Sequence, residues 1–230
     1  MWYLVELYLP VFSVRDAESY QVAVSMLVPL PSTVVGAVGA VLGRMGYCRG
    51  DECLKEARRQ IRLARAVAPT AAKSPVVLRR LRGVLEEGKL PDSIKDITRD
   101  VAGLSDAMTR EYVFAWRLAL ILEGDVKREH LYLIDRLGDS ESLVSVVDVA
   151  EVEPVECTGR VNVVVKSRVV RGGDYMLVRG FDERGDRSIF AVPLRVEGGL
   201  YRASDVEVEG HVKCVEKGDL RAVFPEGYGW

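Results

Sequence analysis

Residues 29–46 constrain the fold more than any other part of the sequence. The segment, PLPSTVVGAVGAVLGRMG, begins with two prolines that exclude a helix before them. Ser32 or Thr33 suits the N-cap of a helix and Gly46 suits its C-terminal stop. One face of this helix would carry only small residues, which are Gly36, Ala40 and Gly43. Each glycine costs about 1 kcal/mol relative to alanine, so the face predicts compensating close packing against a sheet or another backbone.

The rest of residues 1–153 alternates between strand and helix patterns. Residues 21–28 are expected to be a short extended piece, and the polar stretch 83–110 a long loop or insertion. The predicted elements in chain order are a buried strand at 2–9, a helix at 52–68, a strand at 111–122, a short helix at 126–137 that Asp125 caps and Gly138 closes, and a strand at 143–149.

From residue 154 the sequence predicts strands alone. A strand at 161–170 is followed by a Gly172–Gly173 turn and a returning strand at 174–181. A second turn at 182–185 leads to a strand at 188–196. The fold class is therefore α+β, with one domain at 1–153 and a smaller β-rich domain at 154–230.

Composition indicates an ordinary globular protein. The chain has 230 residues, 48% of them hydrophobic, and a formal net charge of −2, which excludes a uniformly basic coat. The opening residues lack the basic region and cleavage site of a signal peptide, and no apolar run reaches the roughly 18 residues of a membrane span. We expect a cytoplasmic protein without a membrane partner.

Cysteine and histidine are scarce, which limits catalysis and metal binding. A disulfide between Cys48 and Cys53 is favoured over a zinc site, because no second cysteine pair matches this one. The histidines are His130, expected on an exposed helix, and His211 in an acidic stretch. No phosphate-binding loop, dinucleotide fingerprint or nucleophile motif is present, so no cofactor, metal or catalytic residue is predicted.

Positive charge is concentrated in residues 44–82. This segment holds eleven Lys or Arg and three acids, a net charge of +8, so the remaining chain carries −10. On the predicted helix 52–68, Arg58, Arg62 and Arg65 form a stripe that is either a solvated face or a phosphate-binding surface. Arginine suits phosphate because its planar fork donates two hydrogen bonds at once. Lys166 and Arg168 would share one strand face for the same purpose.

Three segments together resemble the CRISPR-associated Cas-five family, in particular its archaeal subtype I-A branch. They are the first strand with PVFSVRDAESYQVAVSMLVPLPSTVVGAVGAVLG, then TREYVFAWRLALIL, then RLGDSESLVSVVDV. The resemblance covers residues 2–45 and 109–150, and PLPSTVVGAVGAVLG is its most specific part.

This resemblance implies an RNA-binding RAMP protein with an N-terminal ferredoxin-like (RRM-like) domain and a smaller β-rich C-terminal part. Such a protein sits at one end of the Cascade complex in antiviral defence, where it holds the 5′ handle of the crRNA and contacts a Cas-seven backbone subunit and the large subunit. The N-terminus of the helix at Ser32 and Thr33 would then face a phosphate. Candidate RNA-binding residues are Arg15, Tyr20, Ser32, Thr33, Arg44, Arg58, Arg62, Arg65, Lys166 and Arg168.

Two other functions stay open at the level of sequence. The subtype I-C branch of the family cleaves precursor RNA with a Tyr, Lys and His set, so a metal-independent endoribonuclease that processes CRISPR repeat RNA is the alternative. Neither His130 nor His211 stands in a sequence context that matches that set, so a non-catalytic subunit is preferred. A ferredoxin-like protein–protein module with a solvated basic stripe is the third hypothesis.

Overall fold

The computed structural model describes residues 1–16, 18–19, 22–80, 82, 88, 92–99, 104–227 and 229–230. Its centre is a four-stranded antiparallel sheet in the order β5-β8-β1-β9. The strands are β1 (Trp2–Tyr8), β5 (Ile61–Ala66), β8 (Arg117–Gly124) and β9 (Ser145–Val152). Helices α1 (Pro31–Arg44) and α2 (Asp51–Gln60) connect β1 to β5, and α6 (Arg128–Tyr132) connects β8 to β9. Residues 1–153 thus alternate between strands and helices, as predicted, and these four strands belong to one sheet.

Both faces of the central sheet are buried. Along β1, Val5 and Leu7 belong to a core shared with α1 and α6, whereas Leu4 belongs to a second core. The second core joins the opposite face of the sheet to C-terminal strands through residues such as Val163 and Phe224. Because side chains alternate between the faces of a strand, both layers are packed by the same strands.

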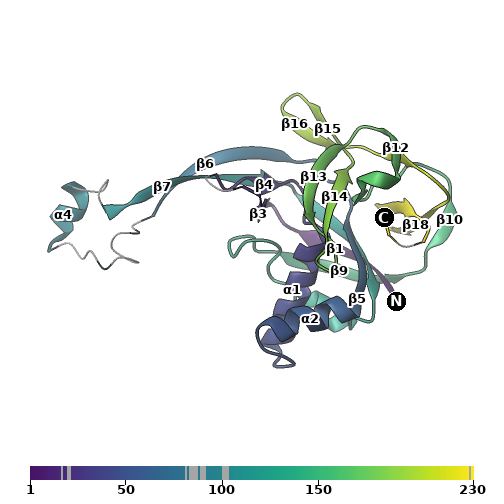
Figure 1. The fold of residues 1–230 in the computed structure, drawn as a ribbon, viewed down its shortest axis with the longest axis horizontal. Coiled ribbons are helices and arrows are strands. Elements are labelled where there is room, and N and C mark those ends of the chain that lie inside the picture. Colours follow the sequence, from purple (N-terminus) through teal and green to yellow (C-terminus); the bar gives the residue numbers. More distant parts are fainter. Residues whose placement is uncertain are drawn as a thin grey trace.

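A long two-stranded arm leaves the body of the molecule (Figure 1). It consists of β6 (Ala72–Arg80) and β7 (Asp106–Phe114), and β2 (Val11–Phe12) pairs with β7 near the base. Two further short strands, β3 (Val14–Arg15) and β4 (Ser25–Met26), pair with each other, and α4 (Ile94–Arg99) lies beyond the arm. The loop predicted over 83–110 is thus wrong for residues 106–110, which belong to β7.

The predicted strand 111–122 is divided between two sheets. Ala115 and Trp116 separate β7, in the arm, from β8, in the central sheet. The near alternation of apolar and polar residues continues through this point. The division is therefore visible only in the pairing, since β7 pairs with β6 and β8 pairs with β1 and β5.

The C-terminal part is built from strands, as predicted, but the single strand expected at 161–170 is wrong, because only residues 165–166 and 170 of that range belong to strands. They are β10 (Val155–Cys157), β11 (Val165–Lys166), β12 (Val170–Gly173), β13 (Met176–Phe181), β14 (Arg187–Val192), β15 (Leu194–Glu197), β16 (Leu200–Ala203), β17 (Val206–Val208), β18 (Val212–Lys217) and β19 (Leu220–Pro225), with a 3-10 turn, η1, at Ser167–Val169. The β13–β14 hairpin confirms the turn predicted at 182–185. Gly172 and Gly173 instead lie within β12, which pairs with β17.

Two predicted helices are shorter than their sequence patterns. The helix expected at 52–68 ends at Gln60, and residues 61–66 form β5. Pairing with β8 buries this segment on both faces, which outweighs the helix propensity of its Leu, Ala and Arg residues. The helix expected at 126–137 spans only Arg128–Tyr132, and its N-cap is Lys127 rather than Asp125.

Helix α1 confirms the prediction for residues 29–46, but its details differ. Leu30 is the N-cap and Pro31 the first helical residue, so Ser32 and Thr33 do not cap the helix. The close approach to another backbone occurs at Gly39, where an added Cβ would lie 3.2 Å from the carbonyl oxygen of Cys53 in α2. Gly36 and Ala40 are exposed, and a Cβ at Gly36 would meet no atom within 4 Å. Gly36 and Ala40 therefore leave an open surface instead of a packed one, whereas a Cβ at Gly43 would lie 3.3 Å from the Sγ of Cys53.

Cys48 and Cys53 form a disulfide with a Cα–Cα distance of 5.1 Å. It ties the loop after α1 to the first turn of α2. Within the described ranges, no three His, Cys, Asp or Glu side chains are grouped to hold a metal ion. No helix in the same ranges is long and apolar enough to cross a membrane.

Candidate RNA-binding groove

The first three turns of α1 form one wall and the floor of a groove of about 520 Å³. Strand β3 and the loop that follows Arg136 complete it. Its lining includes two arginines, three hydroxyl side chains and small residues of α1, namely Arg15, Arg136, Ser32, Thr33, Ser140, Gly36 and Ala40. We call it the α1 groove. Three of the predicted residues, Arg15, Ser32 and Thr33, thus meet at one site.

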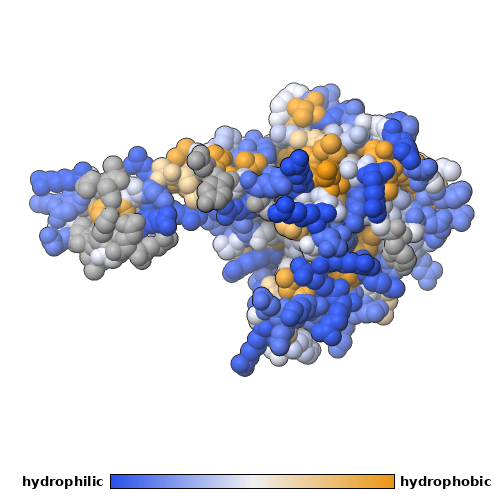
Figure 2. All heavy atoms as spheres, in the orientation of Figure 1, coloured by the Kyte–Doolittle hydropathy of each residue, from blue (hydrophilic) through white to orange (hydrophobic). Residues whose placement is uncertain are grey.

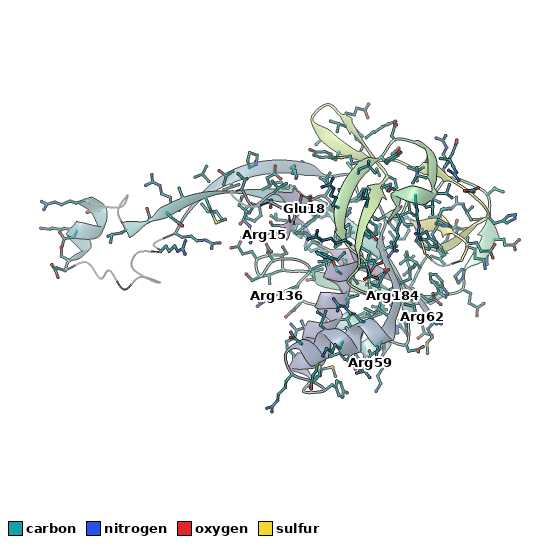
Figure 3. The ribbon with its side chains drawn as sticks, viewed as in Figure 1. Arg15, Glu18, Arg59, Arg62, Arg136 and Arg184 are labelled. Carbon is teal, nitrogen blue, oxygen red and sulfur yellow. A yellow bond between two sulfur atoms is a disulfide. The ribbon has the colours of Figure 1, made fainter. Side chains whose placement is uncertain are left out.

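The two arginines of the α1 groove form no ion pair with an acidic side chain in the described part of the chain, although Arg136 lies near Asp135, whose carboxylate pairs with Arg44. Arg15 and Arg136 are exposed, and neither forms an ion pair. Asp139 also lines the groove, but Arg110 holds its carboxylate in an ion pair. Figure 3 shows Arg15 and Arg136 on the same side of α1. The net charge of the groove is therefore positive.

Helix α1 adds to this positive potential. It has 14 residues and no acidic residue in its first turn, so the positive end of its dipole is not compensated. The hydroxyl groups of Ser32 and Thr33 make no capping hydrogen bond and can donate to a bound anion. An extended polyanion can lie close to the backbone over Gly36, because no side chain rises from the floor there.

A second group of arginines lies where α2 and β5 meet the β13–β14 turn. Arg58 lies against this turn, since a Cβ at Gly185 would be 2.6 Å from its Nη2. Arg59 pairs with Glu56 at 2.8 Å, and Arg62 pairs with Glu123 at 3.1 Å. Figure 3 shows Arg59, Arg62 and Arg184 on this side of the molecule. Arg58 and Arg184 are exposed and have no acidic partner among the residues described.

The predicted stripe of Arg58, Arg62 and Arg65 is wrong, because the helix that would align them ends at Gln60. Arg65 lies on β5 and is 2% exposed. It forms an ion pair with Glu183, donates to the main-chain oxygen of Trp230 and lies 5.3 Å from the Trp230 ring centroid. Arg65 therefore stabilises the core and is removed from any RNA-binding surface.

The expected strand face of Lys166 and Arg168 is also wrong, because Lys166 ends β11 and Arg168 lies in the 3-10 turn. The Nζ of Lys166 donates to Asp182 at 2.8 Å, and Arg168 donates to the carbonyl of Gly229 at 2.8 Å. Arg44 is held by Asp135 and by the carbonyl of Leu133. These three side chains thus have partners within the chain. Tyr20 lies outside the described residues.

A separate pocket of about 600 Å³ brings together Tyr47, Lys127 and His130. The Tyr47 and His130 rings have centroids 5.5 Å apart. His130 is 5% exposed, and its Nδ1 has no hydrogen-bond partner, so the expectation of an exposed histidine is wrong. Helix α6 is short and packs against α1, which turns His130 inward.

Sequence reasoning missed Arg136 and Arg184. Each lies next to a turn, in the sequences RLGD and ERGD. A charged residue beside glycine and aspartate is common in loops, so the sequence contains no signal of a binding role. Only the packing of these turns against α1 and α2 shows that they supply cations to the same surface as the predicted residues.

The overall α+β fold of the chain resembles that of one solved structure. A crystal structure of a CRISPR protein from Archaeoglobus fulgidus has the same overall fold, with a TM-score of 0.57 and 17% identity, and the match covers 98% of this chain and 99% of that one.

Sequence comparison then identifies the family. The family model described as CRISPR-associated protein (Cas_Cas5) matches residues 2–196. A CRISPR-associated protein Cas5 of Thermoproteus tenax is 47% identical over 232 residues, which covers 100% of this chain and 99% of that protein. One of Methanocaldococcus jannaschii is 32% identical over 171 residues, covering 66% and 65%. The chain belongs to the CRISPR-associated Cas5 family, as the resemblance predicted.

Proposed function

We propose that this chain is a non-catalytic RNA-binding subunit of a type I-A CRISPR effector complex. In this proposal the α1 groove holds the 5′ handle of the crRNA, and other surfaces contact a Cas-seven backbone subunit and the large subunit. Membership of the Cas5 family supports the role in CRISPR defence.

We also propose that residues 1–153 form a ferredoxin-like RAMP domain. Its support is the element order strand, helix, strand, strand, helix, strand, given by β1, α1, β5, β8, α6 and β9. The sheet order β5-β8-β1-β9 puts the first and third strands of this series at the centre, as in that fold.

The proposal assigns RNA binding to the α1 groove because the helix-free face of the central sheet is covered. RRM domains read RNA on the face of the sheet that the helices leave open. In this chain that face is buried beneath the C-terminal strands, through residues such as Val163 and Phe224. Free cations on the helix side, above all Arg15 and Arg136, offer an accessible alternative for phosphates.

The test is the salt dependence of RNA binding. We expect the Arg15→Ala/Arg136→Ala protein to bind single-stranded repeat RNA more weakly than wild type. The slope of log K against log salt should become shallower by about 1.4, since each phosphate contact contributes roughly 0.7 for single strands. Fluorescence anisotropy at several salt concentrations measures both quantities.

The matched control is Arg195→Ala/Arg202→Ala, which removes two arginines from the β15–β16 hairpin, distant from the groove (Figure 1). This variant should retain the wild-type slope. Equal losses in both double variants would show that only net charge matters, and would contradict the groove.

A second candidate function, metal-independent endoribonuclease, is favoured by one observation. The pocket of Tyr47, Lys127 and His130 contains the residue types that the subtype I-C branch uses. In such a reaction a base removes the proton of the 2′-hydroxyl, the oxygen attacks the adjacent phosphate, and an acid protonates the departing 5′-oxygen. A buried histidine with a free Nδ1 can exchange such a proton, and Lys127 can stabilise the developing charge.

The two functions are separated by a cleavage assay with chelator present. The non-catalytic proposal expects labelled repeat RNA to be bound and to remain intact. Site-specific cutting that is lost in Tyr47→Phe and Lys127→Ala, and kept in the control Tyr175→Phe, would establish the nuclease instead. Both pocket variants change exposed side chains, so the fold should be retained.

A further inference from the structure

The outward face of the β13–β14 hairpin carries an aromatic and cationic hollow that the α1 groove does not include. Antiparallel register places Phe181 opposite Arg187 and Arg179 opposite Ile189. Residues directly opposite in an antiparallel pair share a face, so all four point the same way. They line a cavity of about 490 Å³ together with Glu18, which pairs with Arg179 at 3.3 Å. We call this cavity the hairpin pocket.

The hairpin pocket combines apolar and cationic side chains. The guanidinium of Arg187 lies 5.9 Å from the centroid of the Phe181 ring, and Ile189 is 46% exposed. Figure 2 shows hydrophobic atoms over β13 and β14 with hydrophilic ones around them. The opposite face of the hairpin packs against the core through Val178 and Phe190, whereas Phe181 is half-buried and Ile189 is exposed on the outward face.

The hairpin pocket is fixed next to the α1 groove. At Gly180 an added Cβ would be 2.1 Å from a methyl carbon of Leu30, the residue that caps α1. The backbone of β13 therefore lies directly on the start of the helix. Glu18, at the rim of the pocket, is three residues from Arg15 in the groove. A strand of RNA in the groove is thus adjacent to the pocket.

We infer that the hairpin pocket takes an unstacked nucleobase of the RNA strand whose phosphates lie in the α1 groove. Every base has an apolar π-face, and aromatic rings and arginine planes are its usual stacking partners in single-stranded RNA. Phe181 and Ile189 supply the apolar surface, and Arg187 supplies both a plane and a charge for the adjoining phosphate. The inference rests on the proposed function.

The test replaces the ring without emptying the pocket. We expect Phe181→Leu to lower the affinity for single-stranded repeat RNA about 5- to 150-fold, the range for loss of one stacked base. Because the ring contacts no phosphate, the salt slope should stay at its wild-type value. Arg187→Ala, at an exposed position that keeps the fold, should lower the affinity and also flatten the slope. Tyr175→Leu, an exposed aromatic just before β13, is the matched control and should bind like wild type.

A second measurement locates the base. RNAs that carry 2-aminopurine at one position at a time should show a position whose fluorescence is quenched by wild type and restored by Phe181→Leu. Unchanged affinity in Phe181→Leu with no such position would overturn the inference, including the case in which a protein subunit covers the hairpin. The proposed function would still stand if Arg15→Ala/Arg136→Ala weakened binding. Failure of the wild type to bind RNA would overturn both.

Discussion

The guanidinium group of Arg65 forms an ion pair with the carboxylate of Glu183, and both side chains are buried between the central sheet and the β13–β14 turn. Glu183 also accepts a hydrogen bond from the backbone N–H of Ala64 at 2.8 Å. This pair joins the edge strand β5 to the turn that carries Arg184. It links the core to the basic surface around α2.

Arg65→Met should therefore unfold the protein more easily without altering a phosphate contact. Loss of the arginine leaves Glu183 buried and unpaired, which costs about 3–5 kcal/mol of unfolding free energy. The double variant Arg65→Met/Glu183→Leu should recover much of this loss. Chemical denaturation measures the stability, and RNA affinity of the folded variants should equal that of wild type. A loss of RNA affinity in fully folded Arg65→Met would show that Arg65 contributes to RNA binding after all.

Two glycines of α1 should respond in opposite ways to leucine. Gly39→Leu forces a side chain against the carbonyl of Cys53, and we expect it to cost about 1–3 kcal/mol of stability. Gly36→Leu meets open space and should raise helix stability by up to about 1 kcal/mol. The new side chain would fill the floor of the α1 groove and weaken RNA binding. Thermal unfolding and fluorescence anisotropy, measured on both variants, test this contrast. Wild-type RNA affinity in Gly36→Leu would show that RNA does not contact the floor of the α1 groove.

Asp182 should make the stability of the β13–β14 turn depend on pH. Burial raises the pKa of its carboxyl, but the hydrogen bonds from Lys166 and from the backbone N–H groups of Asp186 and Arg184 outweigh this, so the pKa lies below its ordinary value. A pKa that is lower in the folded state stabilises the protein fully above the unfolded-state pKa of about 4. The contribution is lost as the pH falls through the lower folded-state pKa.

Asp182→Ala should remove this acid-sensitive part of the stability. We expect it to lower the unfolding free energy near neutral pH by about 1.5–3 kcal/mol, as for hydrogen bonds to a charged group. The difference between wild type and variant should shrink below pH 4. Denaturation at a series of pH values measures it, and a difference that is the same at pH 3 and pH 7 would show that the Asp182 charge does not contribute.

Reduction of the Cys48–Cys53 disulfide should lower stability modestly. The two cysteines are five residues apart, and closing so short a loop restricts the unfolded chain by about 2 kcal/mol in the chain-entropy treatment. Unfolding with and without a reductant measures the difference, and Cys48→Ser should behave like the reduced protein in both conditions. A stability that does not respond to the reductant in wild type would contradict the disulfide.

The sequence alone was sufficient where a local pattern determines local structure. Prolines before residue 32 and Gly46 after the apolar run located α1, because proline and glycine act on their own backbone angles. The turn at 182–185 and the two strands that flank it were predicted for the same reason. The most specific part of the family resemblance, PLPSTVVGAVGAVLG, contains five residues that line the α1 groove, which are Ser32, Thr33, Gly36, Ala37 and Ala40.

Only the tertiary structure decided which charged residues are free. Arg62 and Arg65 follow α2 in one continuous pattern, yet pairing with β8 converts that stretch to a strand and turns Arg65 into the core. Arg136 and Arg184 come to the surface beside α1 and α2 because distant turns pack there. Whether a cation meets a carboxylate or solvent depends on contacts between segments far apart in the chain, and a sequence pattern contains no information about those distances.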